Sequence, residues 1–459
     1  MWHAKYKPLY IFSGLLVFLF AFIIRLVFIL NFTVPWVGDQ PSLFSFSVNV
    51  MNGQYYGTNG AYWPPAFIFF AGFLFKIFGK PEVPDIGIVG VAQVILGAFT
   101  TLLVYLTAYK MFKRIYVGII AGLLYAFLPT AVLYTGFFYT ETLWVFFVFL
   151  SIWLTYVSLE KKRRIYYVIT GISFGLSVLS RPTSLPLAFL TLILYLANAI
   201  TKPEINIDMN SDTSTETSVG TETSIGIGTK IKTDSKPGLK INLKINWKLV
   251  FVPTAIVVVS MFLTILPWTI RNWYVMGEPV LIDVNPGINL YLAHNEKSNG
   301  FWVNMGLDDP VIKLGGTPEA DREGKKRAWE YIKANPGKTI KQAVKVHKLF
   351  WTMENEDIQR MGPEWLKGLQ KFYSFKILSL LGIVGIIAAL ILYHQSLWLI
   401  TYMIAYNGLI DFLYWASRYR FAIEPFLVLF AGLTLAIIFE CIYKCMKKLI
   451  TKIALSVDF

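Results

Sequence analysis

Long apolar runs dominate the chain and predict an almost entirely helical fold. Runs of about 20 apolar residues, the length that crosses roughly 30 Å of hydrocarbon, recur along most of the sequence. They predict about ten crossings and hence an all-α polytopic membrane protein. The predicted spans are residues 9–30, 86–110, 115–138, 142–159, 165–180, 183–200, 249–268, 375–393, 396–414 and 421–440.

The segment "WPPAFIFFAGFLFKIFG", residues 63–79, does not fit this series. It begins with two prolines and is barely long enough to span. Counting it as a crossing would also place the two basic clusters that follow it outside the cell. It is therefore expected to be an interfacial or re-entrant helix of the first external loop, 31–85, with Pro64 and Pro65 at its start, where missing backbone donors cost little. A true span remains the alternative.

Composition and charge fix the class and the orientation. The chain is 55% hydrophobic with a mean hydropathy of +0.54, and Lys and Arg (42) outnumber Asp and Glu (28). The basic residues cluster at the ends of apolar runs, where they set topology and meet anionic lipid, so no nucleic-acid partner is expected. With a cytosolic N-terminus the main clusters all fall inside, and both termini are cytosolic. The clusters are Lys110/Lys113/Arg114, Lys161–Arg164, Lys230–Lys248 and Lys444/Lys447/Lys448/Lys452.

These boundaries divide the chain into five parts. Residues 1–200 form an N-terminal membrane half that contains the first external loop. Residues 201–248 form a cytosolic linker, because the Ser/Thr/Gly/Glu-rich stretch from Ile205 to Lys236 has no apolar period and is expected to be disordered. A single span, 249–268, leads into a small external loop domain, 269–374. Residues 375–459 complete the membrane domain and end in a basic cytosolic tail.

Two isolated acids lie on the external face. Asp39 is the only carboxylate before Glu82, and Glu141 is the only one between Asp85 and Glu160. In a partly desolvated site Asp39 could act as a general base on a sugar hydroxyl, whereas the structural alternative is a turn residue that caps the following helix. Glu141 could hold a metal or face an acceptor. Alternatively, it could simply be stabilised by the helix dipole at the start of its span.

Several external cations are suited to binding phosphate. Arg offers a planar fork of donors that matches phosphate oxygens and does not lose its proton. Arg418 and Arg420 flank Tyr419 on the external side, where the positive-inside rule disfavours them, so a phosphate at the headgroups would explain them; anionic lipid is the alternative. The predicted phosphate-binding residues are Arg181, Arg271, Lys348, Arg418 and Arg420.

A base, a second acid and several cations at one membrane face suit a lipid-linked phosphosugar. The lipid tail would lie in the bilayer, the phosphate on the arginines and the sugar beneath the external loop. The alternative function is a lipid or solute transporter or flippase, which would also line a membrane cavity with charges. A transporter should place them near the bilayer midplane on discontinuous helices, whereas here most lie at one face.

An ordered set of motifs resembles the GT-C superfamily of polyprenyl-phosphate-sugar glycosyltransferases, in the branch of protein O-mannosyltransferases and lipid A aminoarabinose transferases. The motifs are "VGDQP", "GQYYG", "PPAFIFFAGFLFKIFG", "YTETL", "GLSVLSRPTSLPL", "LPWTIRNW", "NLYLAHN" and "RYRFAIEPFLVLFAG", between about residues 36 and 432. The resemblance implies a GT-C-like helical domain, an inverting transferase with Asp39 as catalytic base, and Glu141 near the acceptor or a metal. Many relatives follow the first-loop Asp with another acid, whereas this chain has Gln40.

The resemblance also implies the partners and the location. The donor is expected to be a polyprenyl-phosphate sugar that supplies a hexosyl or pentosyl group, and the acceptor a glycan, lipid or protein of the cell envelope. No cofactor is expected to be obligatory, although a divalent metal ion is a possibility, with Asp39 and Glu141 as candidate ligands. The protein is expected to be a multi-pass protein of the cell membrane with an extracytoplasmic active site.

Overall fold

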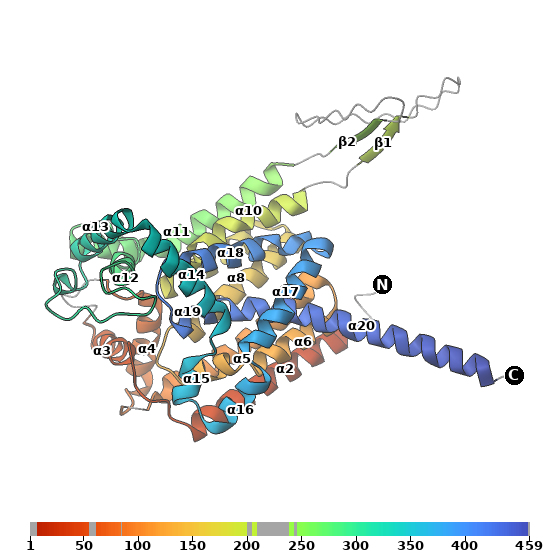
Figure 1. Cartoon of the computed structure of the whole chain (residues 1–459), viewed down its shortest axis with the longest axis horizontal. Helices are drawn as coiled ribbons and strands as arrows, with labels where there is room; N and C mark the ends of the chain where they lie inside the picture. Colours follow the sequence, from red (N-terminus) through yellow and green to blue (C-terminus); the bar gives the residue numbers. More distant parts are fainter. Residues whose placement is uncertain are drawn as a thin grey trace.

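The computed structural model describes residues 7–54, 61–83, 85–199, 204–208, 238–242 and 246–457, and these are mostly helical (Figure 1). The N-terminal half contains α2 (Lys7–Asn31), α3 (Gln40–Met51), α4 (Pro65–Phe78), α5 (Gly87–Phe112), α6 (Ile115–Ala126), α7 (Pro129–Thr135), α8 (Glu141–Lys161), α9 (Arg164–Ser180) and α10 (Leu185–Ala199). The C-terminal half contains α11 (Lys248–Met276), α12 (Asn285–Ala293), α13 (Pro318–Ala334), α14 (Pro336–Thr352), α15 (Glu356–Met361), α16 (Glu364–Phe372), α17 (Phe375–Leu392), α18 (Leu397–Asp411), α19 (Ser417–Phe421) and α20 (Glu424–Val457).

Seven helical stretches of the described residues are long and apolar enough to cross a membrane. They are Pro8–Asn31, Gly87–Phe112, Glu141–Lys161, Pro182–Ala199, Lys248–Met276, Glu364–Leu392 and Glu424–Thr451. The pair α6 and α7, bent by 54°, makes an eighth if it is one span. The remaining predicted spans, 165–180 and 396–414, fall on α9 and α18, which have only 17 and 15 residues. The all-α polytopic class is confirmed, and ten crossings stays a prediction.

Small residues allow the membrane helices to approach closely. Gly171 and Gly175, one turn apart on α9, face α11, and a Cβ at Gly171 would lie 2.3 Å from the carbonyl oxygen of Val257. A Cβ at Gly175 would lie 2.5 Å from the Cβ of Thr264. Close backbone approach replaces the hydrophobic driving force that lipid does not supply. Side chains larger than hydrogen at these two positions would separate α9 from α11.

The first external loop folds as two short helices held by aromatic packing. Helix α4 has 14 residues and follows Pro64; at 1.5 Å per residue it rises about 21 Å, short of the hydrocarbon thickness. Phe44 of α3 lies 5.4 Å from Phe75 of α4 and 5.7 Å from Phe138, measured between ring centroids. Helix α4 is thus short for a crossing, and its placement at the interface stays a prediction.

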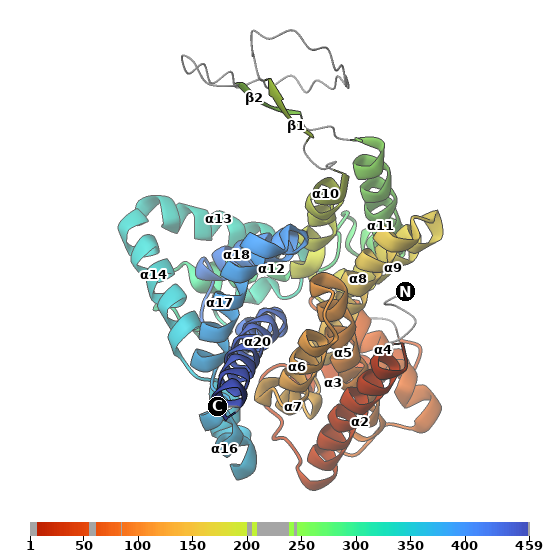
Figure 2. The same cartoon turned by 90° about the vertical axis from the view of Figure 1, so that its right-hand side faces the viewer.

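The loop helices gather at one end of the bundle. Figure 1 shows α3, α4, α12 and α13 at the end opposite to the one where α2 begins and α20 projects. Figure 2 views the molecule from the side of that projecting helix, with the strands beyond α10 and α11. The segments 31–85 and 269–374 thus lie together at one end, which is the arrangement that a shared external face requires.

The predicted linker, 201–248, is described only at its two edges. Strands β1 (Glu204–Asp208) and β2 (Gly238–Asn242) pair antiparallel, with Glu204 opposite Asn242 and Asp208 opposite Gly238. The sequence analysis did not predict this pair, although both strands alternate polar or Gly with apolar residues, because each is only five residues long and borders a Ser/Thr/Gly/Glu-rich stretch. Most of the segment predicted to be disordered, residues 209–237, lies outside the described residues.

Candidate active site

A cavity of about 820 Å³ lies among the loop helices at this end of the bundle. The segments 31–85 and 269–374 both contribute to its wall, the latter partly through α15, together with the segment that leads into α19. Its carboxylates are Asp39, Glu356 and Asp357, and its cations, among the described residues, are Arg360 and Arg418. The wall is formed by Val37–Asp39, Tyr62, Trp63, Phe137, Tyr139, parts of 285–292, residues 301–307 and Ile312, parts of 356–361, and Tyr414–Arg418.

Asp39 forms an ion pair with Arg418 on the cavity wall. The guanidinium donates from Nη1 to Asp39 Oδ2. Asp39 stands at the N-cap of α3, but its side chain makes no capping hydrogen bond. The capping alternative from the sequence is therefore wrong, and the carboxylate faces a cation 379 residues further along the chain. Both side chains remain about a quarter exposed, so solvent and substrate can reach the pair.

The turn before Asp39 is fixed by its neighbours. Gly38 has a φ of +61°, and a Cβ there would lie 2.7 Å from the hydroxyl oxygen of Tyr139. That hydroxyl donates to the carbonyl of Val37 at 3.0 Å. The side chain of Gln40 is buried, donates to the carbonyl of Pro35 at 3.1 Å and accepts from the backbone N–H of Phe138 at 2.8 Å. Gln40 therefore holds the loop in place where many relatives have a second acid.

Arg418 keeps its positive charge in this setting. Its guanidinium carbon lies 5.9 Å from the ring centre of Tyr139 and 5.7 Å from that of Tyr419. Burial alone would lower the pKa of Arg418, but the charge of Asp39, helped by Tyr419 and Glu141, raises the pKa well above its usual value. The predicted phosphate-binding cation is thus present at the cavity, but it is held by a carboxylate.

Glu141 and Arg181 form a second ion pair, behind the cavity wall. Arg181 Nη2 lies 2.8 Å from Glu141 Oε1, and the Glu141 side chain is only 1% exposed. The Arg181 guanidinium also lies 5.5 Å from the ring centre of Trp144. Neither residue lines the cavity. Glu141 nevertheless contributes to the electrostatic field at Arg418, so the two ion pairs are electrostatically linked.

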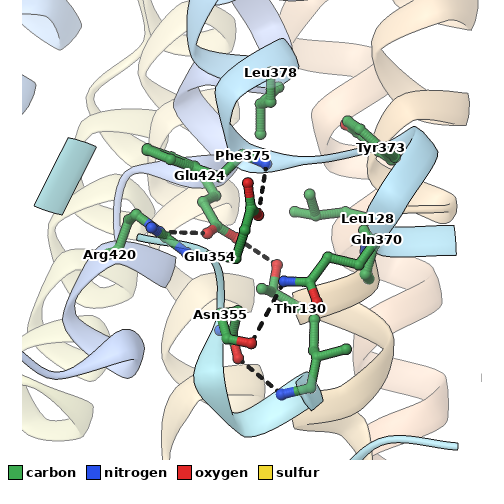
Figure 3. Close-up of a pocket in the computed structure, with 12 residues that line it drawn as sticks. Leu128, Thr130, Glu354, Asn355, Gln370, Tyr373, Phe375, Leu378, Arg420 and Glu424 are labelled. Carbon is green, nitrogen blue, oxygen red and sulfur yellow. Dashed lines mark hydrogen bonds and ion pairs between the residues drawn. The ribbon is translucent and has the colours of Figure 1, made fainter. Parts of the chain in front are cut away.

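Arg420 lies in a different, fully buried cluster (Figure 3). Its Nε donates to Glu424 Oε1 at 3.2 Å, its Nη1 donates to the carbonyl of Met353, and its guanidinium lies 4.0 Å from the ring centre of Phe375. Thr130 donates to the same carboxylate. Residues two positions apart on a helix are rotated by about 200° about its axis. Arg418 and Arg420 therefore cannot face the same site from α19. This structure does not bring Arg420 to the predicted phosphate site.

Arg271 and Lys348 also lie away from the cavity. Arg271, near the end of α11, stacks 4.8 Å from the ring centre of Trp268 and donates to Asn272 Oδ1 at 3.1 Å. Lys348 is exposed on α14. Of the five predicted phosphate-binding residues, only Arg418 therefore lines the cavity.

The sequence did not single out the residues that α15 supplies. Asp357 Oδ2 accepts hydrogen bonds from Tyr134 Oη at 2.9 Å and from Ser417 Oγ at 2.6 Å. Glu356 and Arg360 line the cavity beside it. The available signal was the acidic run "MENEDIQR", residues 353–360, in a loop that already faced the predicted site. The run alone gives no sign of function, because acidic residues are common in exposed loops.

The residues do not fit a metal ion shared by Asp39 and Glu141. Each carboxylate pairs with an arginine, and only Asp39 lines the cavity. Within the part of the chain that the structure describes, no group of three or more His, Cys, Asp or Glu side chains is arranged to hold a metal. No step of the reaction is therefore derived through a metal held by these two residues.

The fold and this cavity define a class, that of polytopic membrane proteins with a GT-C fold. Residues 63–206, which form α4 to α10 and include Glu141 and Arg181, match the family model described as dolichyl-phosphate-mannose-protein mannosyltransferase. No curated protein matches the chain significantly. The family match thus covers the middle of the N-terminal half, and it begins after Asp39.

Solved structures of an oligosaccharyltransferase from Archaeoglobus fulgidus share the fold. The archaeal enzyme AglB in complex with an inhibitory peptide and a dolichol-phosphate has a TM-score of 0.53 at 13% identity, over 98% of this chain and 52% of that one. The complex with Zn and sulfate has a TM-score of 0.54 at 13% identity, over 94% of this chain and 49% of that one. The apo form has a TM-score of 0.54 at 14% identity, over 98% of this chain and 52% of that one. The chain spans about half the length of these proteins. At such identities the likeness shows the fold alone, which is the fold that the resemblance to the GT-C superfamily implies.

Proposed function

We propose that the chain is a membrane glycosyltransferase that moves a sugar from a polyprenyl-phosphate donor to an acceptor, with inversion at the anomeric carbon. The observation that carries this proposal is the Asp39–Arg418 pair on the wall of a large cavity at the loop-bearing end of the bundle. A carboxylate and a guanidinium are the base and the phosphate ligand that the reaction needs. The family match over residues 63–206 adds support for a lipid-linked sugar donor.

In the proposed reaction Asp39 takes the proton of the acceptor hydroxyl. The acceptor oxygen forms a bond to the anomeric carbon as the bond from that carbon to the phosphate oxygen breaks. The electron pair of the broken bond stays on the phosphate, whose negative charge is stabilised by a cation placed in advance. Attack on the face opposite to the leaving phosphate gives inversion.

Arg418 links donor binding to activation of the base. In the structure Arg418 donates to Asp39 Oδ2, so the ion pair fixes the carboxylate against the arginine and not against an acceptor. A donor phosphate is a competing anion with more acceptor oxygens, and it can draw the guanidinium away. Asp39 then becomes available only when a donor is in place. This exchange would limit wasteful reactions in the absence of donor.

The other predicted residues take supporting parts in this proposal. Glu141, paired with Arg181, stabilises the charge of Arg418 from behind the wall. Arg271 and Lys348 lie where they could contact lipid headgroups at the membrane surface, and Arg420 holds α19 to its neighbours. The acceptor, whether glycan, lipid or protein, would enter beside residues 301–307 of the loop domain, which line the cavity. The site would be extracytoplasmic, with both termini in the cytosol.

The test of the proposal is donor turnover. Purified protein in lipid vesicles is incubated with a panel of radiolabelled polyprenyl-phosphate sugars, with crude envelope extract as the acceptor source, and the release of polyprenyl phosphate is followed. Release from one donor, with the sugar appearing on an acceptor, supports the transferase. Movement of intact donor between leaflets without release supports a flippase instead and rejects the proposal.

A further inference from the structure

Most of the arginines around the cavity are committed to carboxylates. Arg418 holds Asp39, Arg181 holds the buried Glu141 and Arg420 holds the buried Glu424. Within the described residues, Arg360 is the other cation of the cavity wall, and it differs from these three in being mostly exposed. Its side chain is 75% exposed, and its ion-pair partner is Glu356, one helical turn earlier on α15, at 3.0 Å.

The Arg360–Glu356 pair is of the kind that exchanges readily. Both residues are on one short helix, both line the cavity, and the arginine faces water. Exposed pairs of this spacing contribute little to stability, because water and salt compete with them. A phosphate group offers more acceptor oxygens than a carboxylate, and the planar fork of guanidinium donors matches them. It would displace Glu356 from the exposed Arg360 more easily than it would displace Asp39 from the partly buried Arg418.

Arg360 lines the cavity from α15, the helix that leads into α16. Helix α16 follows α15 directly and presents Trp365 and Phe372 outward, 48% and 84% exposed. The Trp365 ring lies 6.2 Å from that of Phe28 on α2, which places α16 beside a membrane helix. Figure 1 shows α15 and α16 next to the loop-bearing end of α2. A lipid-linked substrate that approaches from the bilayer on this side would meet α15 first.

We infer that Arg360 is the residue that first binds the phosphate of the lipid-linked donor as the donor enters the cavity. This inference rests on the proposed function. In this sequence of events Arg360 holds the phosphate while Arg418 still holds Asp39, and the phosphate then draws Arg418 away. Arg360 is thus a donor-binding residue, and it takes no part in the proton transfer.

The experiment measures equilibrium binding to the full chain in lipid nanodiscs. The probes are undecaprenyl phosphate, undecaprenol, which lacks the phosphate, and inorganic phosphate, which lacks the lipid. Arg360→Gln is expected to weaken binding of undecaprenyl phosphate about tenfold, as for the loss of a charge-assisted hydrogen-bond pair. Its binding of undecaprenol should not change, and Arg360→Lys should restore part of the affinity. Weak binding of inorganic phosphate alone would show that the lipid is needed for capture.

Arg327→Gln is the matched control. Arg327 forms the same type of pair with Glu323, at 2.7 Å and one turn apart on α13, and it does not line the cavity. The control should bind undecaprenyl phosphate as the wild type does. Equal affinity in the wild type and Arg360→Gln would overturn the role of Arg360 while leaving the proposed function intact. If the wild type bound undecaprenyl phosphate no better than undecaprenol, the proposed function itself would fall.

Discussion

Ser417 Oγ donates a hydrogen bond to Asp357 Oδ2 at 2.6 Å and so ties α15 to the residue that precedes Arg418. Tyr134 of α7 donates to the same oxygen at 2.9 Å. Asp357 thus joins a membrane-embedded helix, a loop helix and the short helix that carries the cavity arginine. The position of Arg418 against Asp39 depends on this three-way contact.

Breaking this contact should impair catalysis through Arg418. Asp357→Ala leaves two hydroxyl groups without their acceptor, at a cost of about 1–3 kcal/mol each. We expect a lower unfolding temperature and the loss of most donor turnover. Ser417→Ala removes only one partner and should lower kcat with a small change in stability. Turnover and thermal unfolding of both variants check this, and a Ser417→Ala enzyme with wild-type kcat would show that Asp357 does not position Arg418.

Removing the cavity guanidinium should weaken donor binding. Arg418→Ala deletes the cation that the leaving phosphate needs and also frees Asp39. We expect at least a tenfold loss of affinity for undecaprenyl phosphate, in line with a charge-assisted pair. Arg420→Ala is an unsuitable control, because it would leave the buried Glu424 unpaired. Arg322→Gln, on the exposed face of α13, is suitable. An unchanged affinity in Arg418→Ala would remove Arg418 from the phosphate site.

A methyl group at Gly38 should displace Asp39. The backbone of Gly38 has a φ of +61°, and its Cβ would lie 2.7 Å from Tyr139 Oη. We expect Gly38→Ala to cost about 1–2 kcal/mol in backbone strain and to lower turnover further through the displaced carboxylate. Combining it with Tyr139→Phe removes the clashing hydroxyl and should recover part of the activity. The backbone strain at position 38 should remain in the double variant. Turnover of the single and double variants checks this; wild-type turnover in Gly38→Ala would show that the turn tolerates a side chain.

The loop domain should lose stability as the pH rises toward neutrality. Burial, with a further effect from Asp321, raises the pKa of Asp283 from 3.8 to about 7. The folded state therefore binds a proton that the unfolded state has already released above pH 3.8. Stability falls as the pH rises from about 4 through about 7, by at most about 4 kcal/mol. Unfolding temperatures of the wild type and Asp283→Asn across this range check the prediction, and parallel curves would contradict it.

Topology alone made Asp39 and Arg418 unusual in the sequence, and the structure brings these two residues together. Asp39 is isolated in its loop, and Arg418 is predicted to lie on the face where cations are disfavoured. Both features can be read from the sequence without knowledge of any tertiary contact. Arg420 was grouped with Arg418 because adjacent cations look equivalent until the register of α19 is known. Asp357 was missed because its partners, Tyr134 and Ser417, are 223 and 60 residues away.

The bend between α6 and α7 shows another limit. Arg25 is fully buried in α2 and donates from Nη1 to the carbonyl of Ala126 at 3.3 Å and from Nη2 to that of Tyr125 at 3.4 Å. It thereby supplies donors to carbonyl groups at the end of α6, just before the break at Pro129, where the carbonyl of Tyr125 also accepts from the backbone N–H of Leu128 at 3.3 Å. The sequence predicted one continuous span, 115–138, since an arginine in one apolar run gives no sign of which other run it will cap.

The most direct test of the account compares the wild type with Asp39→Asn for release of polyprenyl phosphate from the donor that the wild type uses. The substitution keeps the shape of the side chain but removes the base. The account predicts that release falls by roughly a hundredfold or more, while undecaprenyl phosphate binds as tightly as before, or more tightly because Arg418 is no longer held. Equal rates of release in the two proteins would contradict the assignment of Asp39 as the base.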